Sequence, residues 1–322
     1  MEKKNVSQDE IDIYDRQIRL WGIQAQTRIR NARVLLIRVR ELAEEIAKNL
    51  VLAGIDTLTL LDDKKIENIE SKAHFCIDVS NIGMNYADAV SRVLKRFNPS
   101  VILRVNTTPI YDISDDYFST FDLVIATELE LDLIIHLNTI CREKKIPFYS
   151  CAMYGFYGYI FVDLIKHTYS IEKKTHISSK KKARIEYTEQ YCSFSEAINH
   201  EYGKTLTEKR KKKVSPFLPG ILGLLQFQKQ FCRFPTNSSE MSQYLFLVKE
   251  INQKLALSDE NLKESELIHL AKNANHKWSP IASVIGGVLS QDVLNVLSKQ
   301  ERPIQNWFIF DGENCIGPIY QI

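Results

Sequence analysis

The first half of the chain alternates short runs of apolar residues with amphipathic stretches. The apolar runs have the length and composition of buried strands, and they lie at 34–37, 57–62, 101–105, 121–127 and 147–152. The stretches between them have apolar residues at helical spacing, over 42–53, 83–97 and 131–144. This strand–helix order predicts an α/β fold, in which a doubly wound, mostly parallel sheet is covered by helices on both faces through right-handed crossovers.

A separate helix is predicted ahead of the first strand. Ser7 and Glu10 have the spacing of a capping box, and Trp21–Gly22 is a plausible end. One side of this helix is apolar, and its members are Ile11, Tyr14 and Ile18. Arg16 lies roughly opposite that stripe, so we expect it to point away from its own domain.

The regular pattern stops near residue 165. From Lys173 to Lys213 the chain is polar and carries the basic clusters 180–184 and 209–213, which predict a solvated, partly disordered insertion or a nuclear-localisation signal. Apolar helical spacing returns at 217–231 and again around 239–257. We therefore divide the chain into a first Rossmann-like part, a variable insertion with a basic flexible loop and helices, and a C-terminal completion, at 7–165, 166–260 and 261–322.

Two glycine pairs predict close packing. Gly155 and Gly158, set among aromatic residues, indicate a turn into another strand with close backbone approach. Gly286 and Gly287 interrupt a helix that is apolar on most of its circumference. Since glycine lowers helix propensity, a close helix-to-helix approach is the expected reason for this second pair.

The segment from Arg33 to Leu50 reads as the strand, turn and helix that open a nucleotide-binding Rossmann-like unit. Glycines normally form that turn and let backbone amides approach a pyrophosphate. Arg38, Glu41 and Ala43 stand in their places here. Their side chains would fill the space of the pyrophosphate, and Glu41 adds a negative charge at the helix N-terminus, where phosphate would otherwise bind. We predict a Rossmann-like unit whose nucleotide site is degenerate.

Four segments carry a family resemblance, at 14–22 (Tyr-Asp-Arg-Gln-Ile-Arg-Leu-Trp-Gly), 45–62, 279–297 and 306–312. Together they resemble the ubiquitin-activating enzyme superfamily, and within it the small, non-cysteine (Aos-type) subunit of SUMO-activating enzymes. The resemblance is strong over roughly 7–165 and 216–322 and weak between them. It implies a ThiF/MoeB-type adenylation fold, present here as a pseudo-active half with an inserted variable region.

The same resemblance allows the family's nucleotide site to be compared position by position. The aspartate that ends the second strand, suited to ribose hydroxyls, is retained as Asp62. The asparagine and arginine that contact ATP fall on Glu70 and Ala73, and the phosphate-contacting lysine falls on Tyr86. The acidic residue that would face magnesium falls near Glu128. Because most of the donors that a triphosphate requires are lost, no cofactor and no metal is expected in this chain alone.

In this superfamily an arginine at the position of Arg16 reaches across the dimer interface to the ATP phosphates bound by the other subunit. A guanidinium is suited to that role, because it stays charged and offers planar, bidentate donors that would stabilise charge developing on the α-phosphate. The alternative, from the local sequence alone, is an exposed arginine paired with Asp12 or Glu10. Arg19 is expected to be structural or interfacial.

The resemblance further implies a heterodimer with a large catalytic subunit that carries both the ATP site and the cysteine. With ATP and Mg²⁺, that complex adenylates the C-terminal carboxylate of SUMO and releases pyrophosphate. It then moves the acyl group to the cysteine of the large subunit, from which a conjugating enzyme receives it. This chain would be an obligate subunit that supplies half of the scaffold and Arg16, with no active site or catalytic cysteine of its own.

Three other functions remain open. One is the corresponding subunit for a NEDD-type modifier, although a chain of 322 residues leaves little room for the large inserted domain of that subunit. A second is a purely structural Rossmann-like scaffold, which differs from the favoured function only at Arg16. A third is a self-sufficient Rossmann-type oxidoreductase, which would need the missing glycine turn.

Cysteine and histidine positions indicate no further chemistry. We predict packing roles for Cys232, although it precedes Arg233-Phe-Pro-Thr236, and for Cys76, Cys141 and Cys151. The histidines at 74, 136 and 167 have no metal-ligand spacing and are read as structural.

Composition and charge exclude other classes. A net charge of +2 argues against a general nucleic-acid binder. The absence of an apolar leader at the N-terminus, of a CxxC pair and of a membrane-length apolar run predicts a reduced intracellular location, nuclear with a cytoplasmic fraction.

Overall fold

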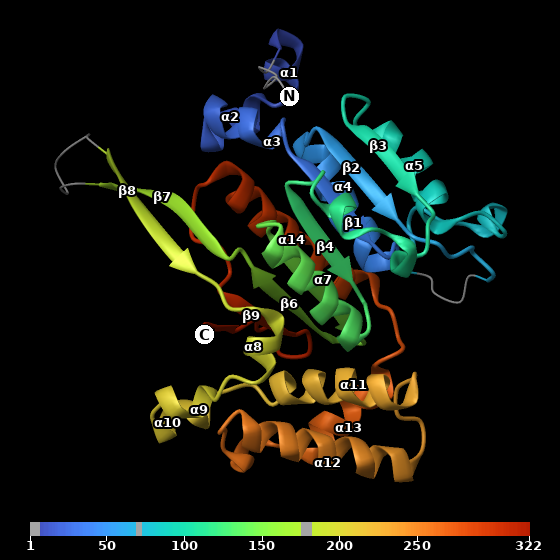
Figure 1. The fold of residues 1–322 in the computed structure, drawn as a ribbon, viewed down its shortest axis with the longest axis vertical. Coiled ribbons are helices and arrows are strands. Elements are labelled where there is room, and N and C mark those ends of the chain that lie inside the picture. Colours follow the sequence, from blue (N-terminus) through green and yellow to red (C-terminus); the bar gives the residue numbers. More distant parts are fainter. Residues whose placement is uncertain (1–6, 69–72, 175–181) are drawn as a thin grey trace.

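The computed structural model describes residues 7–68, 73–174 and 182–322. Its centre is an eight-stranded sheet in the order β10-β9-β6-β5-β4-β1-β2-β3 (Figure 1). The parallel strands are β1 (Arg33–Ile37), β2 (Thr57–Leu61), β3 (Ile102–Asn106), β4 (Leu123–Thr127) and β5 (Phe148–Tyr154). Three antiparallel strands extend the sheet, β6 (Tyr157–Asp163), β9 (Asn306–Asp311) and β10 (Ile319–Tyr320). All five predicted strands are therefore confirmed.

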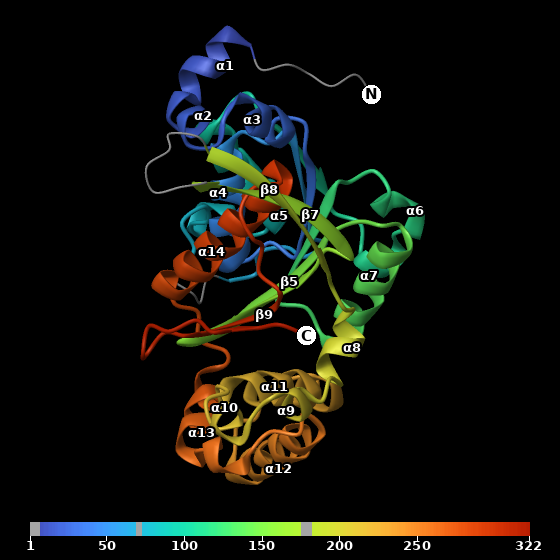
Figure 2. The ribbon, with the colours of Figure 1, turned by 90° about the vertical axis from the view of Figure 1, so that its left-hand side faces the viewer.

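Apolar cores lie on both faces of the sheet, because successive residues of a strand point to opposite sides. Leu36 belongs to the core under α4 (Glu41–Ala53), α5 (Tyr86–Phe97) and α14 (Ser279–Ser298). Leu35 belongs to the core that contains α7 (Leu131–Glu143) and α11 (Phe217–Phe231). Figure 2 shows α4, α5 and α14 on one side of the sheet and α7 on the other. The predicted doubly wound α/β fold is confirmed.

The predicted N-terminal helix is present but divided. α1 (Gln8–Ile13) begins with the expected capping box of Ser7 and Glu10, and α2 (Asp15–Trp21) ends at Gly22, which has φ 86°. Tyr14, with φ −98° and ψ 16°, separates the two. A third short helix, α3 (Ile23–Ile29), leads into β1.

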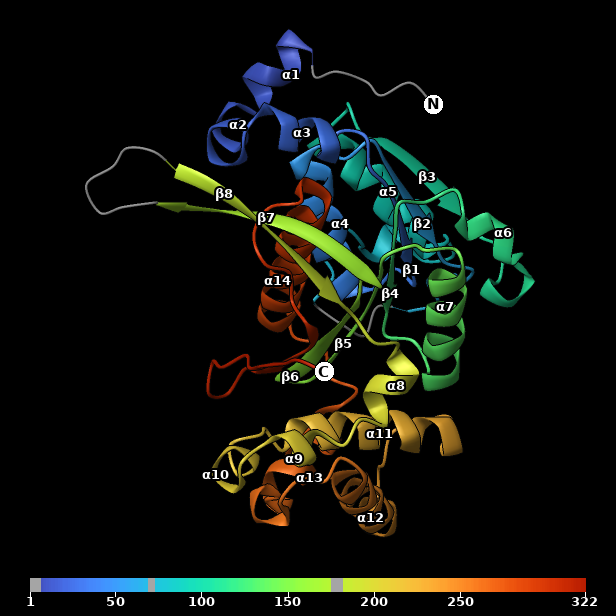
Figure 3. The same cartoon turned by 60° about the vertical axis from the view of Figure 1, so that its left-hand side comes forward.

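The segment after residue 165 is more ordered than predicted. Strands β7 (Lys166–Lys174) and β8 (Lys182–Gln190) form an antiparallel hairpin that projects from the body (Figures 1 and 3). The prediction of a solvated, partly disordered insertion is wrong for these strands. The Tyr169 and Tyr187 rings stack across the hairpin at 5.7 Å between centroids, and charged residues around them hid this pairing in the sequence. Residues 175–181, including part of the 180–184 cluster, lie outside the described residues.

A helical layer packs below the sheet (Figure 1). Besides α11 it contains α8 (Phe194–Ile198), α9 (Tyr202–Thr205), α10 (Glu208–Lys211), α12 (Ser238–Lys254) and α13 (Glu264–Asn273). We placed the start of the C-terminal completion at residue 261; in the structure α13 still packs on α11 and α12, and α14 returns the chain to the sheet. Shorter elements are α6 (Asp115–Phe118) and the 3₁₀ turns Val79–Asn81, Ile110–Asp112 and Asp259–Asn261.

Close packing at the predicted glycines is confirmed at three of four positions. Gly155 makes the turn from β5 to β6 with φ 61°, and a Cβ on Gly158 would lie 2.3 Å from Ile285 Cδ1. A Cβ on Gly286 would lie 2.8 Å from Glu45 Cβ of α4, whereas Gly287 faces open space. The expectation that the chain has no membrane-length apolar run is wrong for α14, which alone among the described residues has the length and hydropathy of a membrane span. Since 61% of that window is buried, it is typical of a core helix.

Candidate functional site

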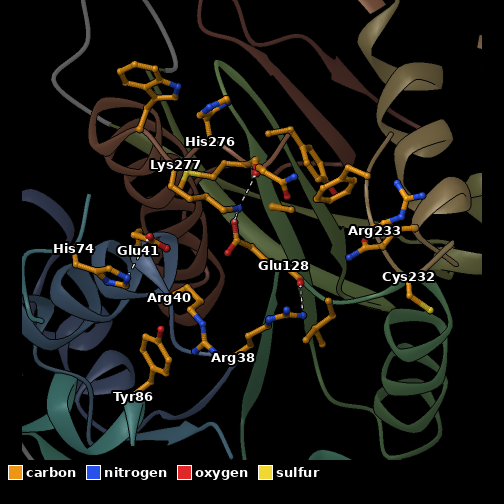
Figure 4. Close-up of a pocket in the computed structure, with 18 of the residues that line it drawn as sticks. Arg38, Arg40, Glu41, His74, Tyr86, Glu128, Cys232, Arg233, His276 and Lys277 are labelled. Atoms are coloured by element: carbon orange, nitrogen blue, oxygen red, sulfur yellow. Dashed lines mark hydrogen bonds and ion pairs between the residues drawn. The ribbon is translucent and has the colours of Figure 1, made fainter. Parts of the chain in front are cut away.

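The degenerate nucleotide loop lies at the carboxyl ends of the parallel strands, where open α/β sheets bind their ligands. A cavity of about 790 Å³ opens there (Figure 4). Its walls come from the β1–α4 turn, the ends of β4 and β5, the C-terminus of α11 and the segment before α14. A neighbouring cavity of about 430 Å³ shares Arg38 and Arg40 with it and includes Asp62.

Arg38 has the backbone conformation of a glycine, but its side chain fills the space that a glycine would leave open. Its φ of 66° lies in the left-handed region that favours glycine. Its Nη1 donates hydrogen bonds to the carbonyl oxygen of Glu128 at 2.7 Å and to Oε1 of Glu130 at 2.9 Å. The side chain thus crosses from the β1 turn to the end of β4, over the path that a phosphate would need.

Asp62 survives in sequence, but the protein itself occupies its carboxylate. Oδ2 accepts a hydrogen bond from the backbone amide of Val39 at 2.7 Å and pairs with the guanidinium of Arg40. Oδ1 accepts the amide of Lys64 at 2.9 Å. The Arg40 guanidinium also lies 3.6 Å from the centre of the Tyr86 ring. Arg40 therefore stands between Asp62 and Tyr86, and three donors of the protein itself already bind the Asp62 carboxylate.

The first turn of α4 is closed by a buried histidine. Glu41 Oε1 lies 3.2 Å from Nε2 of His74, and Glu44 contacts the other ring nitrogen. Glu44 also accepts the amides of Phe75 at 2.9 Å and Cys76 at 3.0 Å. Ala43 is fully buried behind this cluster. The first turn of α4 thus carries two carboxylates, which disfavour an anion at this N-terminus.

The stability contributed by His74 depends on pH. Burial lowers the pKa of His74, but its hydrogen bond to Glu44 and the charges of Glu41 and Glu44 outweigh burial and the opposing charge of Arg40, so the pKa is raised above 6.5. A raised folded-state pKa means that the stabilisation is complete below the unfolded value and is lost as pH rises through the folded value. The stability difference between wild type and His74→Gln, measured by urea unfolding, should be larger at about pH 5.5 than at about pH 8.5. Equal differences would contradict the charged pairing.

The magnesium-facing position is neutralised in the same way. Glu128 forms an ion pair with Lys277, whose Nζ also donates to the carbonyl oxygen of Met153 at 3.2 Å. Ala73, at the position of an ATP-contacting arginine, is 8% exposed, and Glu70 lies outside the described residues. The described residues contain no group of three or more His, Cys, Asp and Glu side chains arranged to hold a metal ion.

These contacts lead to a binding prediction. Arg38, Arg40, His74 and Lys277 each face a carboxylate, so binding a triphosphate would require breaking several ion pairs. We expect the isolated chain to show no ATP binding in calorimetry with Mg²⁺ at protein concentrations that detect dissociation constants up to about 100 μM. A micromolar constant for the folded, isolated chain would contradict this.

Arg16 lies on α2, and no residue of this helix lines the cavity. Its side chain is exposed and makes no hydrogen bond or ion pair with any described residue. The local alternative is not realised, since Glu10 pairs with Arg30 and Asp12 accepts from Gln8 at 3.4 Å. The orientation predicted from the Tyr14 stripe is confirmed. Arg19 pairs with Asp15 at 2.9 Å.

The predicted packing role of Cys232 is wrong, whereas Cys76, Cys141 and Cys151 are buried as predicted. Cys232 is exposed and ends α11 in the left-handed conformation, with φ 57°. The last turn of α11 leaves the core and reaches the cavity rim, where Cys232 and Arg233 lie together (Figure 4). Apolar spacing alone did not show where α11 leaves the core.

Exposure alone does not make Cys232 a thioester site. The adjacent Arg233, a cation that could stabilise a thiolate, is committed to Glu240 in a two-donor ion pair. We expect Cys232→Ser to leave modifier thioester formation by a reconstituted heterodimer within about twofold of wild type. Loss of the thioester band on a non-reducing gel, with assembly intact, would be the contrary result.

Comparison with known proteins identifies the family. Residues 14–317 match the model of the ThiF family, which covers the degenerate loop, the cavity and both glycine pairs. The chain belongs to the ThiF family. This match, together with the relatives described next, confirms the resemblance to the ubiquitin-activating enzyme superfamily.

Its relatives extend over its whole length. It is 34% identical to the DNA damage tolerance protein rad31 of Schizosaccharomyces pombe, over 100% of both chains. It is 33% identical to SUMO-activating enzyme subunit 1 of Xenopus tropicalis, over 98% of this chain and 96% of that protein. Among solved structures, Escherichia coli MccB has the same fold, with a TM-score of 0.57 at 13% identity over 96% of this chain and 72% of that one.

Several residues of the site escaped the sequence analysis. Arg40 and Lys277 were not singled out, and the role of His74 as partner of two glutamates was not foreseen. Two signals were present. Arg40 stands directly before the replaced glycine position at Glu41. Glu41 and Glu44 lie within one helical turn of each other, and such a pair needs a cation when buried. No local signal marked Lys277, which reaches Glu128 from 149 positions away.

Proposed function

We propose that this chain is the small, non-cysteine subunit of a SUMO-activating enzyme. The observation that carries the proposal has two parts. This ThiF-family chain is similar over nearly its full length to proteins named SUMO-activating enzyme subunit 1. Its own nucleotide site is closed by internal ion pairs. A chain of this kind needs a partner that holds the nucleotide. ATP and Mg²⁺ are bound by the large subunit, which adenylates SUMO and accepts it on a cysteine before transfer to a conjugating enzyme.

Within that heterodimer, Arg16 acts in trans on the ATP of the large subunit. The support is geometric: a guanidinium that is exposed, is without a partner among the described residues and projects from a helix anchored to the domain. An unpaired surface guanidinium keeps all its donors for an incoming phosphate. The rest of the chain serves as scaffold.

The remaining alternatives are less well supported. A NEDD-type subunit would carry a large inserted domain, whereas this chain and the SUMO-activating relatives correspond along nearly their entire lengths. A self-sufficient oxidoreductase would need the cavity that Arg38 and Arg40 cross. The scaffold-only alternative differs from the proposal only in the result that it predicts for Arg16→Ala, which is an unchanged rate of pyrophosphate exchange.

Reconstitution tests the proposal directly. The chain is combined with the large subunit of a SUMO-activating enzyme and, in parallel, with that of a NEDD-type enzyme, and SUMO thioester formation is followed on non-reducing gels. We expect a stable complex and a thioester only with the SUMO partner. A thioester at the same rate without this chain, or assembly with the NEDD-type partner alone, would overturn the proposal.

We also propose a nuclear location with a cytoplasmic fraction. The cluster Lys209–Lys213 lies on and after α10, and most of its residues are exposed. Lys211 and Lys212 form surface ion pairs with Glu208 and Glu260. Such pairs are too weak to prevent the cluster from binding an import receptor. Replacing the five positions by neutral residues should shift a fluorescent fusion toward the cytoplasm.

A further inference from the structure

Helices α1 and α2 rest on the domain through few side chains. Of their described residues and Tyr14 between them, only Tyr14 is buried, at 2% exposure, and α2 contains no buried residue. Ile13 and Leu20 are 65% and 78% exposed. The position of this pair of helices therefore depends strongly on how Tyr14 is held.

Tyr14 sits in a seat made by Gly54 and Asn98. Gly54 ends α4 with φ 80°, and a Cβ there would lie 2.4 Å from both Cζ and Oη of Tyr14. Glycine is thus required for the backbone conformation and for the close approach of the ring. The Tyr14 hydroxyl accepts a hydrogen bond from Nδ2 of Asn98 at 2.7 Å, and the same nitrogen donates to the carbonyl oxygen of Val51 at 2.9 Å.

Other contacts fix the two ends of the helical pair. Arg30 joins Glu10 of α1 to Asp56, which it contacts at 3.1 Å. At the other end, Nε1 of Trp21 donates to Gln26 at 2.9 Å. Tyr14 lies between these ends, at the break from α1 to α2, and only two residues before Arg16.

The way in which Tyr14 is held determines the direction in which Arg16 points. Tyr14 is buried and Arg16, two residues later on α2, is exposed, so the contacts that bury Tyr14 leave Arg16 facing away from the domain. We infer that Tyr14, held by Gly54 and Asn98, is a positioning residue that aims Arg16 at the nucleotide of the other subunit. This inference rests on the proposed function. Tyr14 itself touches neither nucleotide nor modifier.

A double-mutant cycle on the heterodimer tests the inference. The readout is SUMO-dependent ATP–pyrophosphate exchange at saturating SUMO, with sedimentation to measure assembly. We expect Tyr14→Ala to lower kcat about tenfold or more with a nearly unchanged KM for ATP, since misplacing a donor that acts in the transition state lowers kcat. Tyr14→Phe, which keeps the ring in its seat, should retain at least about a third of the wild-type rate.

In an Arg16→Ala background, Tyr14→Ala should lower the rate by less than about twofold, because residues that act through one another are not additive. Tyr111→Ala, which removes a tyrosine that is 77% exposed and distant in sequence, is the matched control and should leave both rates unchanged. Tyr14→Leu keeps an apolar side chain in the seat and replaces Tyr14→Ala if that variant fails to assemble; its loss should fall between those of the phenylalanine and alanine variants.

The outcomes separate the inference from the proposed function. A further tenfold loss from Tyr14→Ala in the Arg16→Ala background would overturn the positioning role and leave the role of Arg16 intact. Wild-type exchange by Tyr14→Ala would do the same. Wild-type exchange by assembled Arg16→Ala would instead overturn the role of Arg16 itself, and with it the reason for a positioning residue.

Discussion

Arg16→Ala should reduce SUMO-dependent pyrophosphate exchange by the heterodimer roughly 30-fold to several-hundred-fold, the effect of removing one charge-assisted donor from a developing charge, about 2–4 kcal/mol. Assembly should be unaffected, because the Arg16 side chain is exposed and packs against no core residue. Arg16→Lys should restore only part of the rate, since a single ammonium cannot reproduce the planar fork of a guanidinium.

The matched control is Arg19→Ala, three positions along the same helix. Arg19 is exposed too, and its ion pair with Asp15 is a surface pair of little energetic value. Its removal should leave exchange within about twofold of wild type. Wild-type exchange in an assembled Arg16→Ala complex would leave this chain as scaffold alone.

The largest effect on stability is expected at Glu44. Its carboxylate is completely buried at the start of α4 and accepts two backbone amides, of Phe75 and Cys76, while it pairs with His74. Glu44→Ala would leave both amides and Nδ1 of His74 without their acceptor. We expect a loss of about 2–4 kcal/mol in the free energy of unfolding.

The measurement is urea unfolding of the isolated chain, from which the midpoint and slope of the transition are obtained. Glu264→Ala is the control, because Glu264 and its partner Lys249 are both more than half exposed and their pair is 3.0 Å long. That variant should change stability by no more than about 0.5 kcal/mol. An unchanged midpoint for Glu44→Ala would mean that the cluster at the first turn of α4 does not stabilise the fold.

Much of the central sheet followed from local pattern. Strands such as β4, buried throughout and apolar except for Thr127 at its end, can be recognised because a strand buried on both faces favours apolar residues at successive positions. The hairpin of β7 and β8 could not be recognised from the sequence. Its strands contain few apolar residues, and charged residues of both signs lie among the residues that pair. The break at Tyr14 was missed because a helix periodicity continues smoothly through it.

In the candidate site, too, some features could be predicted from local sequence and others could not. That a phosphate loop had been lost was evident from Arg38, Glu41 and Ala43, because each substitution adds atoms or charge at a place where only a glycine backbone would fit. The burial of Cys232 was predicted wrongly, since the point at which α11 leaves the core depends on elements far away in the chain.

The sequence by itself determined the order of strands and helices, the loss of the nucleotide loop and the outward direction of Arg16, because each depends on neighbouring residues and on helical or strand spacing. Only the tertiary structure decided how the vacated site is held. Lys277 on Glu128, His74 on Glu41 and Glu44, and Asn98 beneath Tyr14 join residues 30 or more positions apart. Such partners are chosen by burial, because a charge or hydroxyl removed from water must find a complementary group wherever the fold brings one within reach.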